Sequence, residues 1–299
     1  YYKNGLLKYG PDDYKRYNVL AKVNASLNKY VDLGINIQYN ADDMAENSSG
    51  ANEIFRLLYE NRGRQPIYQP EKENYPNPYN GDLMDGGNPI DLMKNGGKKT
   101  TQYEAYTGKA QLTIKDLIKN LRVNLSASRR GGYYSQESYI RTLTYYNYVG
   151  NIRKEVNSPN SLYKSQYRAY HDLLEATVNY SFSLKEQHNF NILAGSSYED
   201  YRLNQIKATA NNMISNDFFS FNYYDTSNAT NSILGDNVET WAMMSYFGRI
   251  NYNFKEKYLL EANVRYDGSS RLAPSKRWKA FPSVSAAWRI NEEEWFNVE

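Results

Sequence analysis

The chain is dominated by segments in which apolar and polar residues alternate strictly, joined by connections of two very different lengths. The clearest pair covers residues 19–27 and 31–39, each with an apolar side chain at every second position. A period of two predicts β-strands, because successive side chains of a strand point to opposite faces of its sheet. Asn28, Lys29 and Tyr30 are all that separates the two segments, which predicts a tight hairpin.

The same hairpin pattern recurs along the chain and ends in a single strand. Further strands are predicted over residues 106–114, 121–127, 174–182, 190–198, 246–254, 258–266 and 284–290. These make nine strands of about 9–10 residues, and Tyr1 and Tyr2 would be the end of a tenth.

The connections differ sharply in length between the two ends of the predicted sheet. Turns of about three to five residues, at 115–119, 185–187 and 255–257, form one end. The predicted long loops are 41–104, 129–170, 201–238 and 268–279. A soluble sandwich has loops of mixed length at both ends. Short turns, long loops and ten-residue strands are instead typical of an outer-membrane β-barrel with periplasmic turns and extracellular loops.

Aromatic residues recur where the predicted strands meet the turns. Tyrosine is abundant, with 31 Tyr against 10 Phe and 4 Trp. The strand-end positions are Tyr30, Tyr39, Tyr180, Phe182, Tyr198, Phe254, Tyr258, Tyr266 and Trp295. In a barrel such residues form girdles at the two membrane interfaces. The alternative is that tyrosine is simply a good strand former.

The second face of each predicted strand is polar and carries charges. Near the end of the chain it holds Arg249, Asn251, Glu261, Asn263 and Arg265. Charged side chains cannot face hydrocarbon cheaply, so the apolar face would contact lipid. We therefore predict that these five residues face the lumen of the barrel.

Composition excludes several classes of protein. The net charge of +3 suggests neither a nucleic-acid-binding protein nor an acidic tail, and there is no cysteine for a disulfide or a thiolate metal site. No run of about 18 apolar residues predicts a transmembrane helix. His171 and His188 lie far apart in sequence, and no phosphate-binding loop, nucleophile elbow or histidine metal pair occurs. We expect no enzyme activity, cofactor, metal site or nucleic-acid partner.

The longest predicted loop, 41–104, is too long to be only a connector. Its segment GANEIFRLLYENRG has Ile54, Leu57 and Leu58 at helical spacing, which predicts a short amphipathic helix. The following PIYQPEKENYPNPYNGDLMDGG is rich in Pro, Asn and Gly and should be extended and irregular. Its Tyr, Asn and Asp side chains suit a sugar or a peptide, and suit an ordinary wet loop equally well.

The segment SYFGRINYNFKEKYLLEANVRYDGSSRLAPSKRWKAFPSVSAAWRINEEEWF resembles the SusC/RagA family of TonB-linked outer-membrane transporters. DDYKRYNVLAKVNASLNKYVDLGINIQYN is similar to an earlier hairpin of that family, so the resemblance extends over nearly the whole chain. Leu272 and Ala273 depart from it, because members more often have Phe-Gly there.

The resemblance implies a 22-stranded barrel with an N-terminal plug, energised by TonB, that imports glycans or peptides beneath a SusD-like surface lipoprotein. Residues 1–299 would be nine to ten strands of that barrel, with the plug and the remaining strands absent. The expected location is the outer membrane of a Gram-negative, Bacteroidetes-like cell. Two alternatives remain, a soluble or surface all-β glycan-binding protein and a small passive porin closed by these strands alone.

The family-signature segment Asp267, Gly268, Ser269, Ser270 and Arg271 is predicted to begin an outward-facing loop. Gly268 would permit a tight bend, and Asp267 and Arg271 would either pair with each other or hydrogen-bond the loop into shape. We expect this segment to have a structural role rather than to bind ligand.

Overall fold

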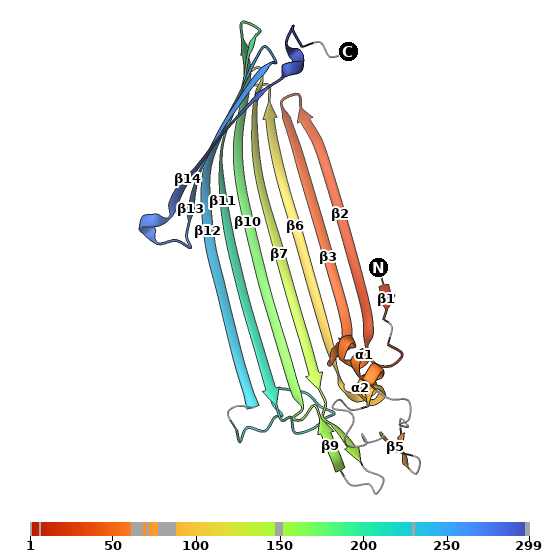
Figure 1. Cartoon of the computed structure of the whole chain (residues 1–299). Helices are drawn as coiled ribbons and strands as arrows, with labels where there is room; N and C mark the ends of the chain where they lie inside the picture. The colour runs from red at the N-terminus through yellow and green to blue at the C-terminus, as the bar shows by residue number, and fades with distance from the viewer. Residues whose placement is uncertain are drawn as a thin grey trace.

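The computed structural model describes residues 2–5, 7–60, 68–69, 72–76, 88–146, 152–228 and 231–296. Ten strands form one antiparallel sheet in which neighbours follow chain order (Figure 1). They are β1 (Tyr2–Asn4), β2 (Asp12–Asn28), β3 (Val31–Asn47), β6 (Gly97–Lys115), β7 (Leu121–Ile140), β10 (Ser161–Leu184), β11 (His188–Asn211), β12 (Ser232–Phe254), β13 (Tyr258–Ser269) and β14 (Trp278–Trp288). Within these described ranges, no helix is both long enough and apolar enough to cross a membrane.

The predicted series of hairpins is confirmed, with β1 as the tenth strand beside β2. The predicted strand lengths are wrong. β10 and β11 each have 24 residues, so much of the predicted loops 129–170 and 201–238 is strand. The alternation fades in these extensions because polar residues occupy both faces, as at Ser135 and Gln136 of β7. In these extensions the strands still pair through their backbones, although neither face carries a row of apolar side chains.

The two ends of the sheet differ as expected, and we call them the turn end and the loop end. Figure 1 shows the turns at the top and the long connections with the helices at the bottom. In two of the turns, Lys185-Glu186 and Lys255-Glu256, both residues have positive φ between 50° and 59°. Left-handed backbone at both central positions matches the twist of a tight hairpin.

Two helices and two small hairpins lie at the loop end. They are α1 (Gly50–Glu60), α2 (Pro89–Asn95), β4 (Tyr68–Gln69) with β5 (Lys72–Pro76), and β8 (Leu143–Tyr146) with β9 (Ile152–Val156). The helix predicted from GANEIFRLLYENRG is confirmed as α1, and residues 61–63 lie outside the described residues. Most of the segment predicted to be irregular also lies outside them, and its described parts form the β4–β5 hairpin.

A small apolar core packs α1 and α2 against β8. Its buried members are Ile54, Leu57, Leu92, Met93, Leu143 and Tyr145. Helix α2 begins at Pro89, and the side chain of Asn88 accepts hydrogen bonds from the amides of Ile90 and Asp91. This N-cap followed by proline at the first helical position is a standard start signal that the sequence analysis missed.

The strands become much shorter from β13 onward. β12 has 23 residues, whereas β13 and β14 have 12 and 11. β13 pairs with β12 from Met243 to Phe254, and the β13–β14 connection, with the short helix η2 (Pro274–Lys276), stops partway along the sheet (Figure 1). The chain then returns to the turn end, where η3 (Ile290–Glu292) follows β14.

Candidate functional site

Strand register separates a polar face of the sheet from an apolar face. Directly paired residues on neighbouring strands lie on the same face, so a row of partners can be followed across the sheet. One such row is Asn24, Gly34, Gln111, Ser126, Glu175, Ser197, Ser245, Asp267 and Lys279. The adjacent row is Ala25, Leu33, Leu112, Leu125, Ala176, Ser196, Tyr246, Tyr266 and Ala280. The two faces therefore differ in polarity across nine strands.

The five residues predicted to face a lumen share the polar face of β12 and β13. Arg249 is paired with Asn263, and Asn251 with Glu261. Arg265 donates to Asp267 at 2.7 Å and to the buried Ser245 hydroxyl at 3.0 Å. The Nε of Arg249 is buried and has no hydrogen-bond partner among the described atoms.

Amide and hydroxyl side chains cover the polar face toward the turn end. Asn179 and Asn191 exchange hydrogen bonds at 3.1 and 3.2 Å, and Asn191 also donates to Ser181 at 2.8 Å. Lys115 neutralises Asp32 at 2.5 Å. Such a surface is strongly hydrated, so it suits contact with water or with a polar polypeptide.

An aromatic cluster lies on the polar face near the middle of the long strands, just beyond the apolar band on its loop-end side. His171, Tyr201 and Trp241 are direct partners on β10, β11 and β12, and the Tyr201 and Trp241 rings stack with centroids 5.5 Å apart. The Arg271 guanidinium lies 5.2 Å from the Trp241 ring and pairs with Glu239. We call His171, Tyr201, Trp241, Glu239 and Arg271 the vestibule cluster.

The sequence analysis missed the vestibule cluster. Tyr201 is the first residue of the predicted loop 201–238, and His171, Glu239 and Trp241 lie between the predicted loops and strands. A signal existed in the spacing: Glu239 and Trp241 continue the odd-numbered polar positions of β12, such as Arg249 and Asn251. Extending that period beyond residue 246 would have placed both residues on the polar face.

The family-signature segment contains a strand end and a turn. Gly268 does not make a bend. It lies in β13 with the Trp278 ring above it, where a Cβ atom would come within 2.6 Å of the ring. Ser270 continues the ladder by donating its amide to the Ala242 carbonyl at 2.9 Å. The expected Asp267–Arg271 pair is wrong, because Asp267 pairs with Arg265 and Arg271 pairs with Glu239.

The apolar face has a defined height. On β10 it runs from Leu174 to Leu184, which is ten residue rises or ~33 Å along the strand. A strand tilt of about 40° would reduce this to ~25 Å, the height of the apolar band of outer-membrane barrels. Toward the loop end, the next outward residue, Asp172, forms an ion pair with Arg129 at 2.6 Å. Val178 and Val284 are 43% and 72% exposed, so this face is uncovered.

Aromatic rings gather at the turn end of the apolar face. Centroid distances of 4.7–6.3 Å link Tyr180, Phe182, Phe190, Tyr252, His188, Phe254, Tyr258, Trp288 and Trp295. A second group, Tyr246, Tyr266 and Trp278, lies nearer the loop end. Aromatic residues therefore occupy two levels of the same face, as the girdle interpretation requires.

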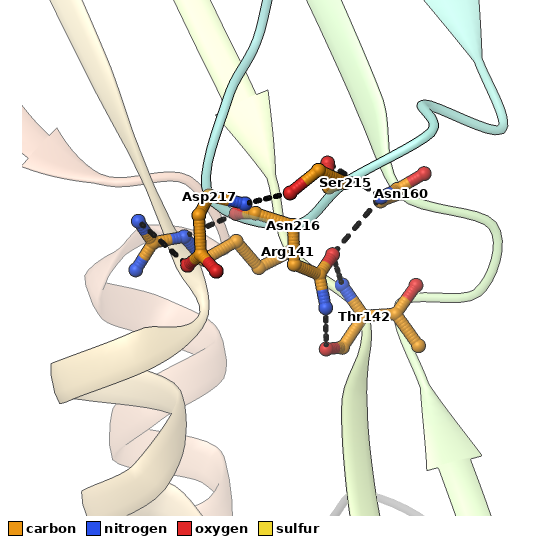
Figure 2. A network of polar contacts seen from close by, with 6 residues as sticks. All are labelled: Arg141, Thr142, Asn160, Ser215, Asn216 and Asp217. Carbon is orange, nitrogen blue, oxygen red and sulfur yellow. Dashed lines mark hydrogen bonds and ion pairs between the residues drawn. The ribbon is translucent and has the colours of Figure 1, made fainter. Parts of the chain in front are cut away.

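A polar network joins two connections at the loop end (Figure 2). The Asn216 amide accepts from the Thr142 backbone at 3.1 Å and donates to the Thr142 carbonyl at 2.8 Å. Asn160 donates to Asn216 at 3.0 Å, and the Arg141 Nε donates to the Asn216 carbonyl at 2.9 Å. The β11–β12 connection is thereby held against the chain between β7 and β10.

The polar and apolar faces, the band height and the unequal ends are those of an outer-membrane barrel wall. The family model described as "TonB dependent receptor-like, beta-barrel" matches residues 52–298. The chain belongs to this family. It is therefore an outer-membrane protein and not an enzyme. The sheet is open, with β1 and β14 at its edges among the described residues.

Curated TonB-dependent receptors share segments of this sequence. P26 of Formosa agariphila is 35% identical over 119 residues, which are 40% of this chain and 12% of that protein. SusC of Bacteroides thetaiotaomicron is 47% identical over 51 residues, 17% of this chain and 5% of SusC. The matched segments therefore span about a tenth or less of those relatives. The resemblance to SusC/RagA receptors is confirmed.

Solved structures support the same receptor fold. The RagAB peptide importer in its closed-closed state matches with a TM-score of 0.69 and 19% identity, over 94% of this chain and 31% of that one. A second structure of the RagAB peptide transporter gives a TM-score of 0.70 at 20% identity. At this identity the likeness establishes the fold, and the expected barrel-wall architecture is confirmed.

Proposed function

We propose that this receptor imports oligosaccharides or peptides across the outer membrane and that its polar face lines the path. The observation that carries the proposal is the continuous polar face, which runs the length of the sheet behind an apolar face of membrane height. The five residues Arg249, Asn251, Glu261, Asn263 and Arg265 would then face the lumen.

Cargo that enters from the loop end would meet the vestibule cluster near the middle of the long strands. Tyr201 and Trp241 stack on each other, so their ring edges rather than their faces are directed to the lumen. Glu239 and Arg271 add an acceptor and a donor beside them. This mixture suits cargo with many hydroxyl or amide groups, which both sugars and peptides have.

The proposed partners are a SusD-like surface lipoprotein at the loop end and TonB at the turn end. SusC and the RagAB importer are the relatives that support this assignment. TonB would act through a plug that lies within the barrel. The amide surface around Asn179 and Asn191 would be the part of this chain that contacts such a plug.

Depletion of a defined cargo mixture tests the proposal. Living cells receive oligosaccharides and oligopeptides together, and mass spectrometry follows which of them leave the medium. We expect one class to be depleted by wild-type cells, and neither class by cells that lack the receptor or that are treated with a proton uncoupler. Equal depletion by wild-type and deletion cells would contradict the proposal.

The same assay separates the alternatives. Uptake that persists with the uncoupler would indicate a passive porin, whereas cargo retained on cells without uptake would indicate a surface binding protein.

A matched pair of variants on β12 tests the vestibule cluster. Trp241→Ala should lower uptake about tenfold or more, since truncation of an aromatic residue at the centre of a binding surface costs about 2 kcal/mol. Tyr246→Phe, on the opposite face, should leave uptake unchanged.

A further inference from the structure

The apolar face contains a groove that its role as a barrel wall does not require. The groove measures about 670 Å³ and lies across β3, β6, β7, β10 and β11. Small residues form its floor, and larger apolar side chains of the flanking strands form its walls. The floor is Gly108, Ala110 and Ala127, and the walls include Ile35, Ile37, Leu174 and Tyr198.

The hollow at Gly108 is open space. A Cβ atom added to Gly108 would meet no atom within 4 Å, whereas one added to Gly268 on the same face would meet the Trp278 ring. Toward the turn end the groove continues over Leu112, Leu125 and Ala176 into a second hollow of about 490 Å³. The combined groove follows the strands from Asp172 to Ala176 on β10, over the part of the apolar band nearest the loop end. Its shape and polarity fit an extended hydrocarbon chain.

The loop end of the groove is bounded by arginines with unused donors. The Arg129 guanidinium binds Asp172 through two hydrogen bonds of 2.6 and 2.7 Å, and Arg202 donates to Asp200 at 2.9 Å. The arginine side chains are 60% and 68% exposed, against 30% and 20% for their carboxylate partners. A guanidinium has five N–H donors in a fixed fork, so donors remain directed outward on both arginines.

We propose that this groove binds one phosphorylated lipid of the leaflet that surrounds the loop end. The phosphate accepts from Arg129 and Arg202 beside Gly108, and an acyl chain lies over Ala110, Ala127 and Ala176. The charged row lies one level beyond Leu174, where the apolar band ends and a lipid headgroup would lie. The arginines contact the lipid, and the carboxylates do not.

Native mass spectrometry of the receptor extracted from the outer membrane tests this site, with diphosphorylated lipid A as the probe. We expect wild-type protein to retain one lipid A. Arg129→Gln with Arg202→Gln should weaken retention about tenfold or more, because two charge-assisted contacts are lost. Gly108→Ile should weaken it similarly by filling the groove, and Ala110→Leu provides a second filling variant. Heat-dependent gel mobility reports correct barrel assembly of every variant.

Two controls make the test decisive. Asp172→Asn breaks the ion pair and keeps the guanidinium, so retention should stay near wild type. Val264→Leu enlarges a side chain on the same face outside the groove and should also have no effect. Equal loss in Asp172→Asn and the arginine variants would overturn the proposal, because the ion pair alone would then matter. So would unchanged retention in both filling variants, or displacement of lipid A by inorganic phosphate alone.

Discussion

At the scale of single residues, two glycines on the apolar face have opposite surroundings. Gly268 is buried beneath the Trp278 ring, whereas Gly108 faces open space. Gly268→Ala should therefore lower the free energy of unfolding by about 1–3 kcal/mol, since the ring must move. Gly108→Ala should change it by less than about 0.5 kcal/mol. Denaturant unfolding in detergent micelles measures both, and equal effects would contradict the Trp278 packing.

Glu293 is a second residue whose surroundings predict a measurable effect. Its carboxylate accepts from the Tyr258 hydroxyl at 2.7 Å, from Lys257 at 3.0 Å and from the Trp288 indole at 3.0 Å. These hydrogen bonds lower the pKa of Glu293 to about 2. Because the pKa is lowered on folding, the stabilisation is present above the ordinary pKa of 4.5 and is lost as pH falls from there toward 2.

Thermal unfolding as a function of pH checks this expectation. Glu293→Gln should lower the melting temperature at pH 7, and the difference from wild type should shrink as pH falls below about 4.5. Glu292→Gln is the matched control, because its carboxylate accepts from Asn291 alone in the described contacts. If the difference in melting temperature between Glu293→Gln and wild type does not change with pH, the carboxylate charge is not what stabilises this turn.

At the scale of elements, the β11–β12 connection depends on Asn216. Its side chain makes three hydrogen bonds that link Thr142 and Asn160 (Figure 2). Asn216→Ala leaves those groups without their partner, at a local cost of about 1–3 kcal/mol. Amide hydrogen exchange over residues 212–224 should become faster, and Asn222→Ala, at an exposed position, should not change it. Unchanged exchange in Asn216→Ala would mean that other contacts fix this connection.

The elements that the sequence predicted well are those with one wet face and one apolar face. The hairpins around Lys29, Lys185 and Lys255 alternate strictly, and their turns and the strand ends beside the turns were predicted to within a residue or two. The outer halves of β7, β10 and β11 were missed because water lies on both sides and the period disappears. The vestibule cluster was lost with them, since its register depends on those strand halves.

At the scale of the whole molecule, the two faces should respond differently to charge. Val178 lies in the middle of the apolar band, and the adjacent Asn179 lies on the polar face. Val178→Arg should cost ~2–4 kcal/mol of stability in lipid vesicles, whereas Asn179→Arg should cost far less. Folding into vesicles, followed by heat-dependent gel mobility, compares them. Equal tolerance of both variants would contradict the assignment of the faces.

The most direct test of the barrel wall with a polar lumen is an accessibility scan along β10 in membranes. The chain contains no cysteine, so single cysteines can be introduced one at a time from residue 173 to residue 182 and spin-labelled. We predict that the accessibility of the spin label alternates with a period of two. Oxygen, which dissolves in lipid, should collide most often with labels at even positions, and a water-soluble nickel complex should collide most often with labels at odd positions. Nickel access at every position, or the reverse alternation, would contradict the barrel wall with a polar lumen.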